Sequence, residues 1–146
     1  LIKDVPVTID QWYKQKEIYL NHKNYSIEKV GLATLFLNRT NYSGVISSGP
    51  IGGFAQTGKY NISCRFNKDN IVKIILALSE LKSCVQIYNL DALKLLDELY
   101  NRRDNIFLYL DPPYVKKGAS LYANYYNIED HIKLRNKIIE KFFTEA

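Results

Sequence analysis

The chain has 146 residues, of which 47% are apolar and 24% are charged, and its formal net charge at pH 7 is +5. The length is that of one ordinary domain, and the apolar fraction is sufficient for a hydrophobic core. No apolar stretch approaches the length of a membrane-spanning helix and no signal peptide is visible, so we expect no membrane partner and a bacterial-type cytosolic location. The excess of Lys and Arg over Asp and Glu, 20 to 15, suits a polyanionic partner without requiring one.

The two cysteines, Cys64 and Cys84, lie in different segments and lack the spacing of metal ligands. We expect both to be small buried thiols in a reducing compartment, and we expect no metal site. The chain contains no methionine and starts at Leu1, which predicts a piece excised from a longer protein.

Two helices are predicted near the start of the chain. Residues 10–21 form a polar helix, with possible buried contacts at Trp12, Ile18 and Leu20. Ser26 is a plausible N-cap for a second helix over residues 27–37, which carries apolar residues at Val30, Ala33, Leu35, Phe36 and Leu37.

Residues 38–67 change in character, because glycine recurs at positions 44, 49, 52, 53 and 58, with Pro50 among them. This punctuation predicts turns and short strands arranged as β-hairpins. Most of the other side chains are polar, so the segment offers many hydrogen-bonding groups but could not form a core by itself.

From residue 68 the pattern predicts alternating helices and strands. Asp69 can cap a helix whose apolar residues are spaced three and four apart, at Ile71, Ile74, Ile75 and Leu78. Residues 84–88 are predicted to be a strand. Asp91 stands at the start of a helix that carries Leu93, Leu96 and Leu99.

A second strand is predicted at residues 106–110, and a closing helix begins at Ile128 after a loop over residues 115–127. Alternating strands and helices predict an α/β fold with a partial doubly wound parallel sheet, preceded by the helical and β-hairpin region.

The most specific motif is the tetrad Asp111, Pro112, Pro113 and Tyr114, which directly follows the predicted strand at residues 106–110. The two prolines end the strand and stiffen the turn, which places the tetrad at the carboxyl edge of the sheet, where ligands bind in open α/β folds. As a plain alternative, the strand simply ends at a diproline turn with Asp111 as a cap.

This tetrad suits chemistry on an aromatic exocyclic amine. Such an amine is a poor nucleophile because its lone pair is delocalised into the ring. The Asp111 carboxylate and the Pro112 carbonyl can accept its two N–H hydrogens, and Pro112 brings no competing N–H. Tyr114 can stack on the face of a planar base.

The tetrad resembles the catalytic motif of Dam-like adenine-N6 DNA methyltransferases. Further segments match this family in the expected order, namely residues 36–44, 49–53, 58–60, 64–67, 89–92, 117–118, 121–122 and 130–131. The resemblance implies a target-recognition, DNA-binding region at residues 1–66. Residues 67–146 would then be part of a Rossmann-like catalytic domain.

The resemblance also implies the substrates and partners. The methyl donor would be S-adenosylmethionine, and the target an adenine flipped out of double-stranded DNA. The family's Phe-x-Gly-x-Gly cofactor motif would precede residue 1. A cognate restriction endonuclease is a possible partner, and an exposed strand edge in the half-sheet could pair with a second copy.

Further site residues follow from the resemblance. Asn89 and Asp91 match a region that helps to bind the adenosyl group, although Asp91 could equally be a helix N-cap. Tyr42 matches an aromatic residue that can wedge into DNA, or it is an ordinary exposed turn residue. Ser43 and Ser47 occupy base-reading positions, where serine discriminates weakly.

Three basic residues, Arg39, Lys59 and Arg65, are candidate phosphate contacts. For Arg39, an internal hydrogen bond to an Asp or a backbone carbonyl is an equally good interpretation.

Two other functions stay open at the level of sequence. One is methylation of another planar amide or amine, such as a protein glutamine, although those enzymes favour Asn at the first tetrad position. The other is a non-catalytic fragment that only binds DNA.

Overall fold

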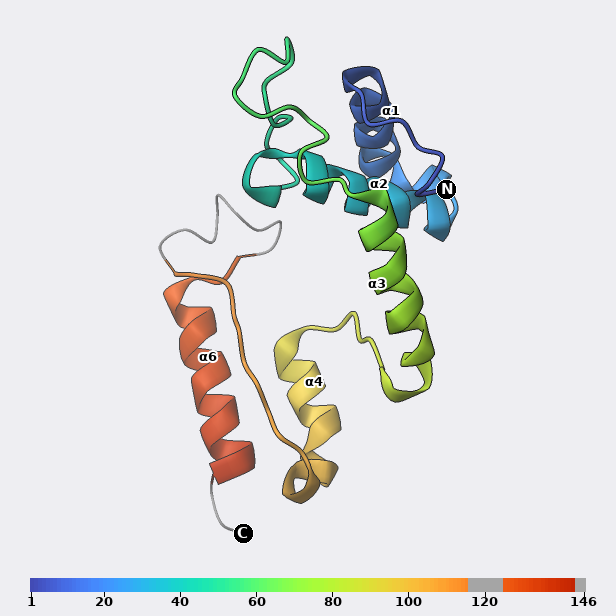
Figure 1. Cartoon of the computed structure of the whole chain (residues 1–146). Helices are drawn as coiled ribbons and strands as arrows, with labels where there is room; N and C mark the ends of the chain where they lie inside the picture. Colours follow the sequence, from blue (N-terminus) through green and yellow to red (C-terminus); the bar gives the residue numbers. More distant parts are fainter. Residues whose placement is uncertain (116–124, 144–146) are drawn as a thin grey trace. The chain divides into compact units, whose positions relative to one another are not determined.

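A computed structural model describes residues 1–115 and 125–143 of the chain. The chain divides into two compact units, Leu1–Val85 and Gln86–Ala146, which are drawn together in Figure 1 and described separately below. The matching segments 117–118 and 121–122 lie outside the described residues.

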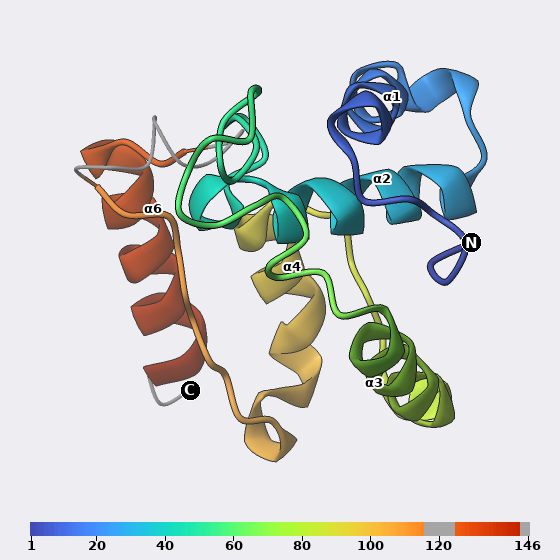
Figure 2. The same cartoon turned by 45° about the horizontal axis from the view of Figure 1, so that its top comes forward.

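The first unit is built from three helices, α1 (Ile9–Leu20), α2 (Ile27–Thr40) and α3 (Lys68–Glu80). Short 3₁₀ turns follow each helix at His22–Asn24, Tyr42–Gly44 and Lys82–Cys84. Helix α1 packs against α2 (Figure 2). The two helices predicted near the start of the chain are therefore confirmed, and the second extends three residues further than expected.

Local side chains explain where two of these helices begin. The Thr8 hydroxyl accepts a hydrogen bond from the backbone N–H of Gln11, which satisfies one of the free donors at the start of α1. Asn67 does the same for α3 by accepting from Asn70. The prediction of Asp69 as the cap is therefore wrong, and Asp69 lies in the first turn.

The core of the first unit joins α1, α2, α3 and the chain between α2 and α3. Its buried residues are Val5, Trp12, Phe36, Leu37, Ile62, Phe66 and Ile71. Phe36 is fully buried, and its ring centroid lies 5.2 Å from that of Phe66. Trp12 is buried as expected, whereas Leu20 is 63% exposed because it lies in the last turn of α1, so that part of the prediction is wrong.

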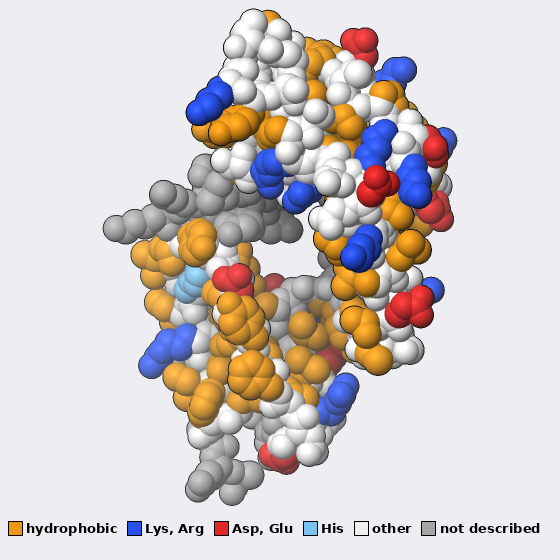
Figure 3. Space-filling view, in the orientation of Figure 1, with side chains coloured by type: hydrophobic (Ala, Val, Ile, Leu, Met, Phe, Trp, Pro, Cys, Tyr) orange, Lys and Arg blue, Asp and Glu red, His pale blue; other side chains and the backbone are white. Residues whose placement is uncertain are grey.

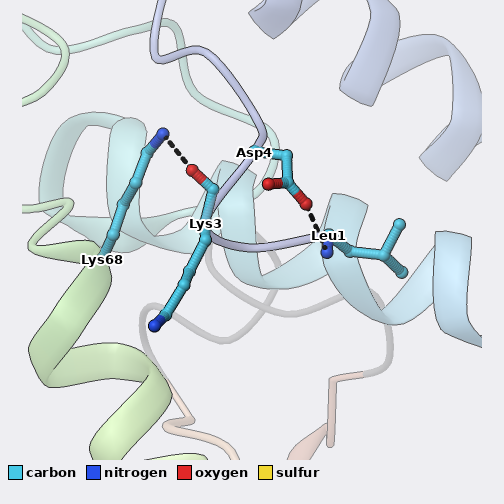
Figure 4. A network of polar contacts seen from close by, with 4 residues as sticks. All are labelled: Leu1, Lys3, Asp4 and Lys68. Atoms are coloured by element: carbon cyan, nitrogen blue, oxygen red, sulfur yellow. Dashed lines mark hydrogen bonds and ion pairs between the residues drawn. The ribbon is translucent and has the colours of Figure 1, made fainter.

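The N-terminal segment is tied to α3 by polar contacts (Figure 4). The Lys68 ammonium, in the first turn of α3, donates to the Lys3 carbonyl at 2.8 Å. The N-terminal ammonium of Leu1 lies 3.1 Å from Oδ2 of Asp4. Both side chains of that ion pair are exposed, so it contributes little to stability.

The second unit contains α4 (Ala92–Leu99) and α6 (Ile128–Ile138), which pack against each other. A 3₁₀ segment (Tyr100–Asn105) follows α4, and a π-helical turn (Ile139–Phe143) follows α6. Leu96 and Leu134 are its most deeply buried apolar residues among those described. The predicted helices at Asp91 and Ile128 are thus confirmed.

An ion pair accompanies this apolar contact, because Nζ of Lys137 lies 2.6 Å from Oδ1 of Asp97. We expect Asp97→Asn to reduce the free energy of unfolding of the second unit by less than about 1 kcal/mol, since the carboxylate is half exposed and solvent screens the pair. Hydrogen exchange of the α4 and α6 amides would measure the change. A larger loss would mean that the ion pair, rather than apolar packing, stabilises the unit.

The predicted parallel sheet is wrong, because the described residues form no strand and no sheet. Val85 and Ile106 do have extended backbone, as the apolar patterns at residues 84–88 and 106–110 require. A strand, however, also needs backbone partners in a ladder, and the described part of the chain contains only one isolated antiparallel bridge, between Asn41 and Pro50.

The predicted β-hairpins between α2 and α3 are also absent from the described residues. Side-chain amides donate hydrogen bonds to backbone carbonyls that would otherwise be available to pair with a second strand of a hairpin. Asn41 Nδ2 donates to the carbonyls of Val45 and Ile46, and Gln56 Nε2 donates to those of Ile51 and Gly53. Local side-chain bonds of this kind compete directly with strand pairing.

The expectation of buried thiols is wrong as well, because Cys64 and Cys84 are both exposed. Ile62 and Phe66 enter the core on either side of Cys64, which leaves the residue between them facing solvent. Cys84 lies in the exposed 3₁₀ turn after α3.

Candidate functional site

The tetrad Asp111–Tyr114 lies at the end of an extended, non-helical segment of the second unit. Asp111 and Tyr114 are exposed, the latter by 61%, while Pro112 and Pro113 are half-buried. The Asp111 carboxylate and the Tyr114 ring are therefore within reach of a molecule in solution.

The segment before the tetrad alternates in burial. Ile106 and Leu108 are half-buried, whereas Phe107 and Tyr109 are 92% and 80% exposed. Alternation with a period of two is the property of extended backbone, in which successive side chains point to opposite sides. The tetrad thus follows an extended segment, although the described residues form no neighbouring strands.

Asp91 lies at the start of α4, where its Oδ1 accepts a hydrogen bond from the Leu93 N–H at 3.0 Å. Its role as an N-cap is therefore real. Asp91 also lines a pocket of about 180 Å³, together with Leu93, Tyr125, Tyr126, Asp130 and Lys133. Asp91 alone of the predicted site residues is part of this lining, and Asn89 lies outside it, exposed.

The opposite wall of this pocket is fixed by a capping box at the start of α6. The Asn127 side chain accepts from the Asp130 N–H at 2.8 Å, and Asp130 Oδ2 accepts from the Asn127 N–H at 3.2 Å. Burial, and then the nearby carboxylates of Asp91 and Asp130, raise the pKa of Tyr126. The pocket therefore combines a phenol ring and the Asp91 carboxylate with an ion pair, in which Nζ of Lys133 lies 3.6 Å from Oδ1 of Asp130.

The Asp91 carboxylate can accept hydrogen bonds from hydroxyl or amino groups, and a phenol can lie against a ring. The volume is below the roughly 300–1,000 Å³ of typical small-molecule sites, so the pocket could take only part of a molecule as large as S-adenosylmethionine.

In the first unit, Tyr42, Ser43 and Ser47 lie on one loop after α2, and all three are exposed. Ser43 has a φ of 54° and Gly44 a φ of 74°, so the chain turns through left-handed backbone at this point. These three predicted DNA-binding residues therefore lie on one solvent-facing loop, residues 42–48.

Two of the predicted basic residues flank this loop. Arg39 Nε donates to the Arg65 carbonyl at 2.9 Å, which is the internal bond considered as its alternative role. The Arg65 guanidinium lies beside Gly44, where a Cβ added to the glycine would be 3.8 Å from Nη2. Lys59 is exposed on the next loop, with its ammonium 5.6 Å from the ring centroid of Tyr60.

Figure 3 shows further Lys and Arg side chains on the surface of the first unit, whereas apolar side chains cover much of the visible face of the second unit. Within residues 1–115 and 125–143, no helix combines the length and apolarity needed to cross a bilayer. The same residues contain no group of three or more His, Cys, Asp or Glu side chains placed to bind a metal ion.

A family model for the D12 class N6 adenine-specific DNA methyltransferases matches residues 1–142. The chain belongs to this family. No match was found among curated proteins or among solved structures. The chain is accordingly an adenine-N6 DNA methyltransferase, and the resemblance identified from the tetrad and its flanking motifs is confirmed.

Two amide side chains of this methyltransferase, Asn41 and Gln56, fix the chain between α2 and α3 and were not identified from the sequence. Each takes part in three hydrogen bonds, all with groups of that segment except the one that Asn41 accepts from Trp12 on α1. Asn41 is fully buried, although asparagine is rarely so. A polar residue directly after a helix was the only available signal, and it does not distinguish a buried amide from an exposed turn.

Proposed function

We propose that this methyltransferase transfers a methyl group from S-adenosylmethionine to the exocyclic amine of an adenine flipped out of double-stranded DNA. Asp111 and the Pro112 carbonyl accept the two amine hydrogens, and Tyr114 stacks on the base. The observation that carries this proposal is the exposed tetrad at the end of an extended segment in a chain of this family.

The residues of the tetrad act by orientation and electrostatics. Two acceptors at one edge of the base direct the nitrogen lone pair away from the ring plane and favour attack on the methyl group. Pro113 restricts the backbone of Pro112 and so stiffens the position of its carbonyl. S-adenosylmethionine supplies the electrophilic methyl group when it is bound. The amine proton lost after transfer can pass to Asp111 or to water.

We assign the adenosyl end of the donor to the pocket at Asp91, with Asn89 close by in sequence. The fit is supported by the Asp91 carboxylate and the Tyr126 ring, which both line the pocket. Its small volume is consistent with binding one end of the donor only.

DNA would be contacted by the first unit. Tyr42, which is exposed, would wedge beside the flipped base, and the exposed Ser43 and Ser47 are candidates for base contacts. Arg39, Lys59 and Arg65 would neutralise phosphates, which positions DNA without reading its sequence. The cognate endonuclease, self-association and cytosolic location stay predictions.

Nucleoside mass spectrometry tests the proposal. The full-length enzyme is incubated with S-adenosylmethionine and duplex DNA, and the DNA is then digested to nucleosides. We expect the product nucleoside to be N6-methyl-2′-deoxyadenosine. Methylated cytosine, or methylated protein amide with unmodified DNA, would contradict the assigned acceptor.

A further inference from the structure

The loop at residues 42–48 follows α2, begins with the 3₁₀ turn Tyr42–Gly44 and is fixed by several internal hydrogen bonds. Gly44 N–H donates to the Asn41 carbonyl, Val45 N–H to that of Tyr42, and Ser48 N–H to that of Val45. Ser48 Oγ adds bonds of 2.9 Å to the carbonyls of Tyr42 and Val45. A loop tied in this way has few conformations to lose on binding.

The Asn41 side chain is the centre of this network. It is fully buried, and its Nδ2 donates to the carbonyls of Val45 and Ile46, both at 3.0 Å. Its Oδ1 accepts a 2.6 Å hydrogen bond from Nε1 of Trp12 on α1. The indole N–H can only donate, which defines the orientation of the amide and leaves both amide hydrogens for the loop.

A second residue of α1 reaches the same loop. The Lys16 ammonium donates to the Ile46 carbonyl at 2.8 Å and lies 5.9 Å from the centroid of the Trp12 ring. The Ile46 carbonyl is therefore bound by both Asn41 and Lys16. Helix α1 thus determines the path of a loop about 30 residues later in the chain.

The next residue after Asn41 has the opposite environment. Asn41 is 0% exposed, whereas Tyr42 is 70% exposed. The junction between them is further restrained because the Tyr42 N–H donates to the Gly49 carbonyl at 3.0 Å. The direction in which the Tyr42 ring leaves the surface is therefore set by the buried side chain before it.

We propose that Asn41 is a positioning residue for DNA, with Trp12 and Lys16 as its anchors on α1. It presents the Tyr42 turn to the duplex in a fixed conformation. This inference rests on the proposed DNA contact of Tyr42. No side chain other than an amide offers one acceptor to the indole and two donors to the loop carbonyls at this place.

The test compares Asn41→Ala and Trp12→Phe with Thr40→Val in the full-length enzyme. Thr40 is a matched control, since it is also fully buried and its hydroxyl donates to the Phe36 carbonyl within α2, away from the loop. We expect the first two variants to raise the KM for DNA about tenfold, because the Tyr42 turn must then be ordered on binding, with an unchanged KM for S-adenosylmethionine. Thr40→Val should leave both constants unchanged.

Two further measurements separate the possible failures. Asn41→Ala should speed hydrogen exchange at the Val45 and Ser48 amides, and unchanged exchange would overturn the positioning role. Asn41→Ala combined with Tyr42→Ala should raise the KM for DNA no more than Tyr42→Ala alone, because both act through the same contact. Additive effects of the two substitutions on the KM for DNA would also overturn the positioning role, as would an equal rise of this KM in Thr40→Val. The flipped base can be followed by the fluorescence of 2-aminopurine placed in the DNA. A Tyr42→Ala enzyme with a normal KM for DNA and a normal fluorescence change would instead disprove the proposed DNA contact of Tyr42.

Discussion

Asp111→Ala is expected to lower kcat for DNA methylation by about 10²–10³-fold or more, the range seen when a polar group that stabilises a transition state is removed. The carboxylate is one of two acceptors proposed to orient the adenine amine, and alanine leaves one N–H without a partner. Because Asp111 is exposed and outside the described core, its removal should not affect folding. Transfer of a radiolabelled methyl group to duplex DNA would measure the loss.

Two companion variants make this result specific to the acceptor. Asp111→Asn keeps the size of the side chain and one acceptor oxygen but removes the negative charge, so it should retain more activity than Asp111→Ala. Tyr109→Ala removes an 80% exposed side chain from the same extended segment and should retain activity and DNA binding. An active Asp111→Ala enzyme would remove the basis of the proposed mechanism.

The helices were largely predictable from the sequence because their determinants are local. Apolar spacing and capping residues within four positions identified α1, α2, α4 and α6. The error at α3 was small, since Asn67 and Asp69 are both good caps and only the backbone geometry distinguishes them. Periodicity also overestimated burial on α3, where Ile71 is buried but Ile74 and Leu78 are at least half exposed.

The sheet was not predictable in the same way, because strand pairing depends on partners far apart in sequence. The apolar run at residues 106–110 predicted a buried strand, and Ile106 does have extended backbone, but Phe107 and Tyr109 are exposed. It could not indicate whether another strand lies alongside. Extended backbone was therefore inferred correctly, and its membership of a sheet was not.

Sequence motifs identified the residues of the candidate site, but only the structure shows the hydrogen bonds that hold them in place. Tyr42, Ser43 and Ser47 were selected by resemblance and lie on one exposed turn. The hydrogen bond from Trp12 to Asn41 joins residues 29 positions apart, and no local sequence pattern predicts a contact over that separation. Arg39 illustrates the remaining ambiguity, since a cation can bind a phosphate or a backbone carbonyl, and here it binds the Arg65 carbonyl.

Gly52→Ala is expected to lower the free energy of unfolding of the first unit by about 2–5 kcal/mol, from left-handed backbone strain and steric overlap together. Gly52 has a φ of 84°, and a Cβ there would lie 2.5 Å from the Tyr60 carbonyl oxygen, a backbone atom that cannot swing away. Urea unfolding followed by Trp12 fluorescence would measure the change. Trp12 is the only tryptophan of the chain, and its ring packs edge-on against Phe54 at 5.6 Å, next to this loop.

Two other glycines serve as controls that separate strain from overlap. Gly53 has a φ of 73° but no atom within 4 Å of an added Cβ, so Gly53→Ala should cost only the backbone strain of about 1–2 kcal/mol. Gly31 lies inside α2 with open space around it, so Gly31→Ala should stabilise the unit by about 0.5–1 kcal/mol through helix propensity. The order of stability should therefore be Gly31→Ala, the unaltered protein, Gly53→Ala and Gly52→Ala. If Gly52→Ala were no worse than Gly53→Ala, the close approach of Gly52 to Tyr60 would not constrain the loop, and its glycine would be needed only for its backbone angle.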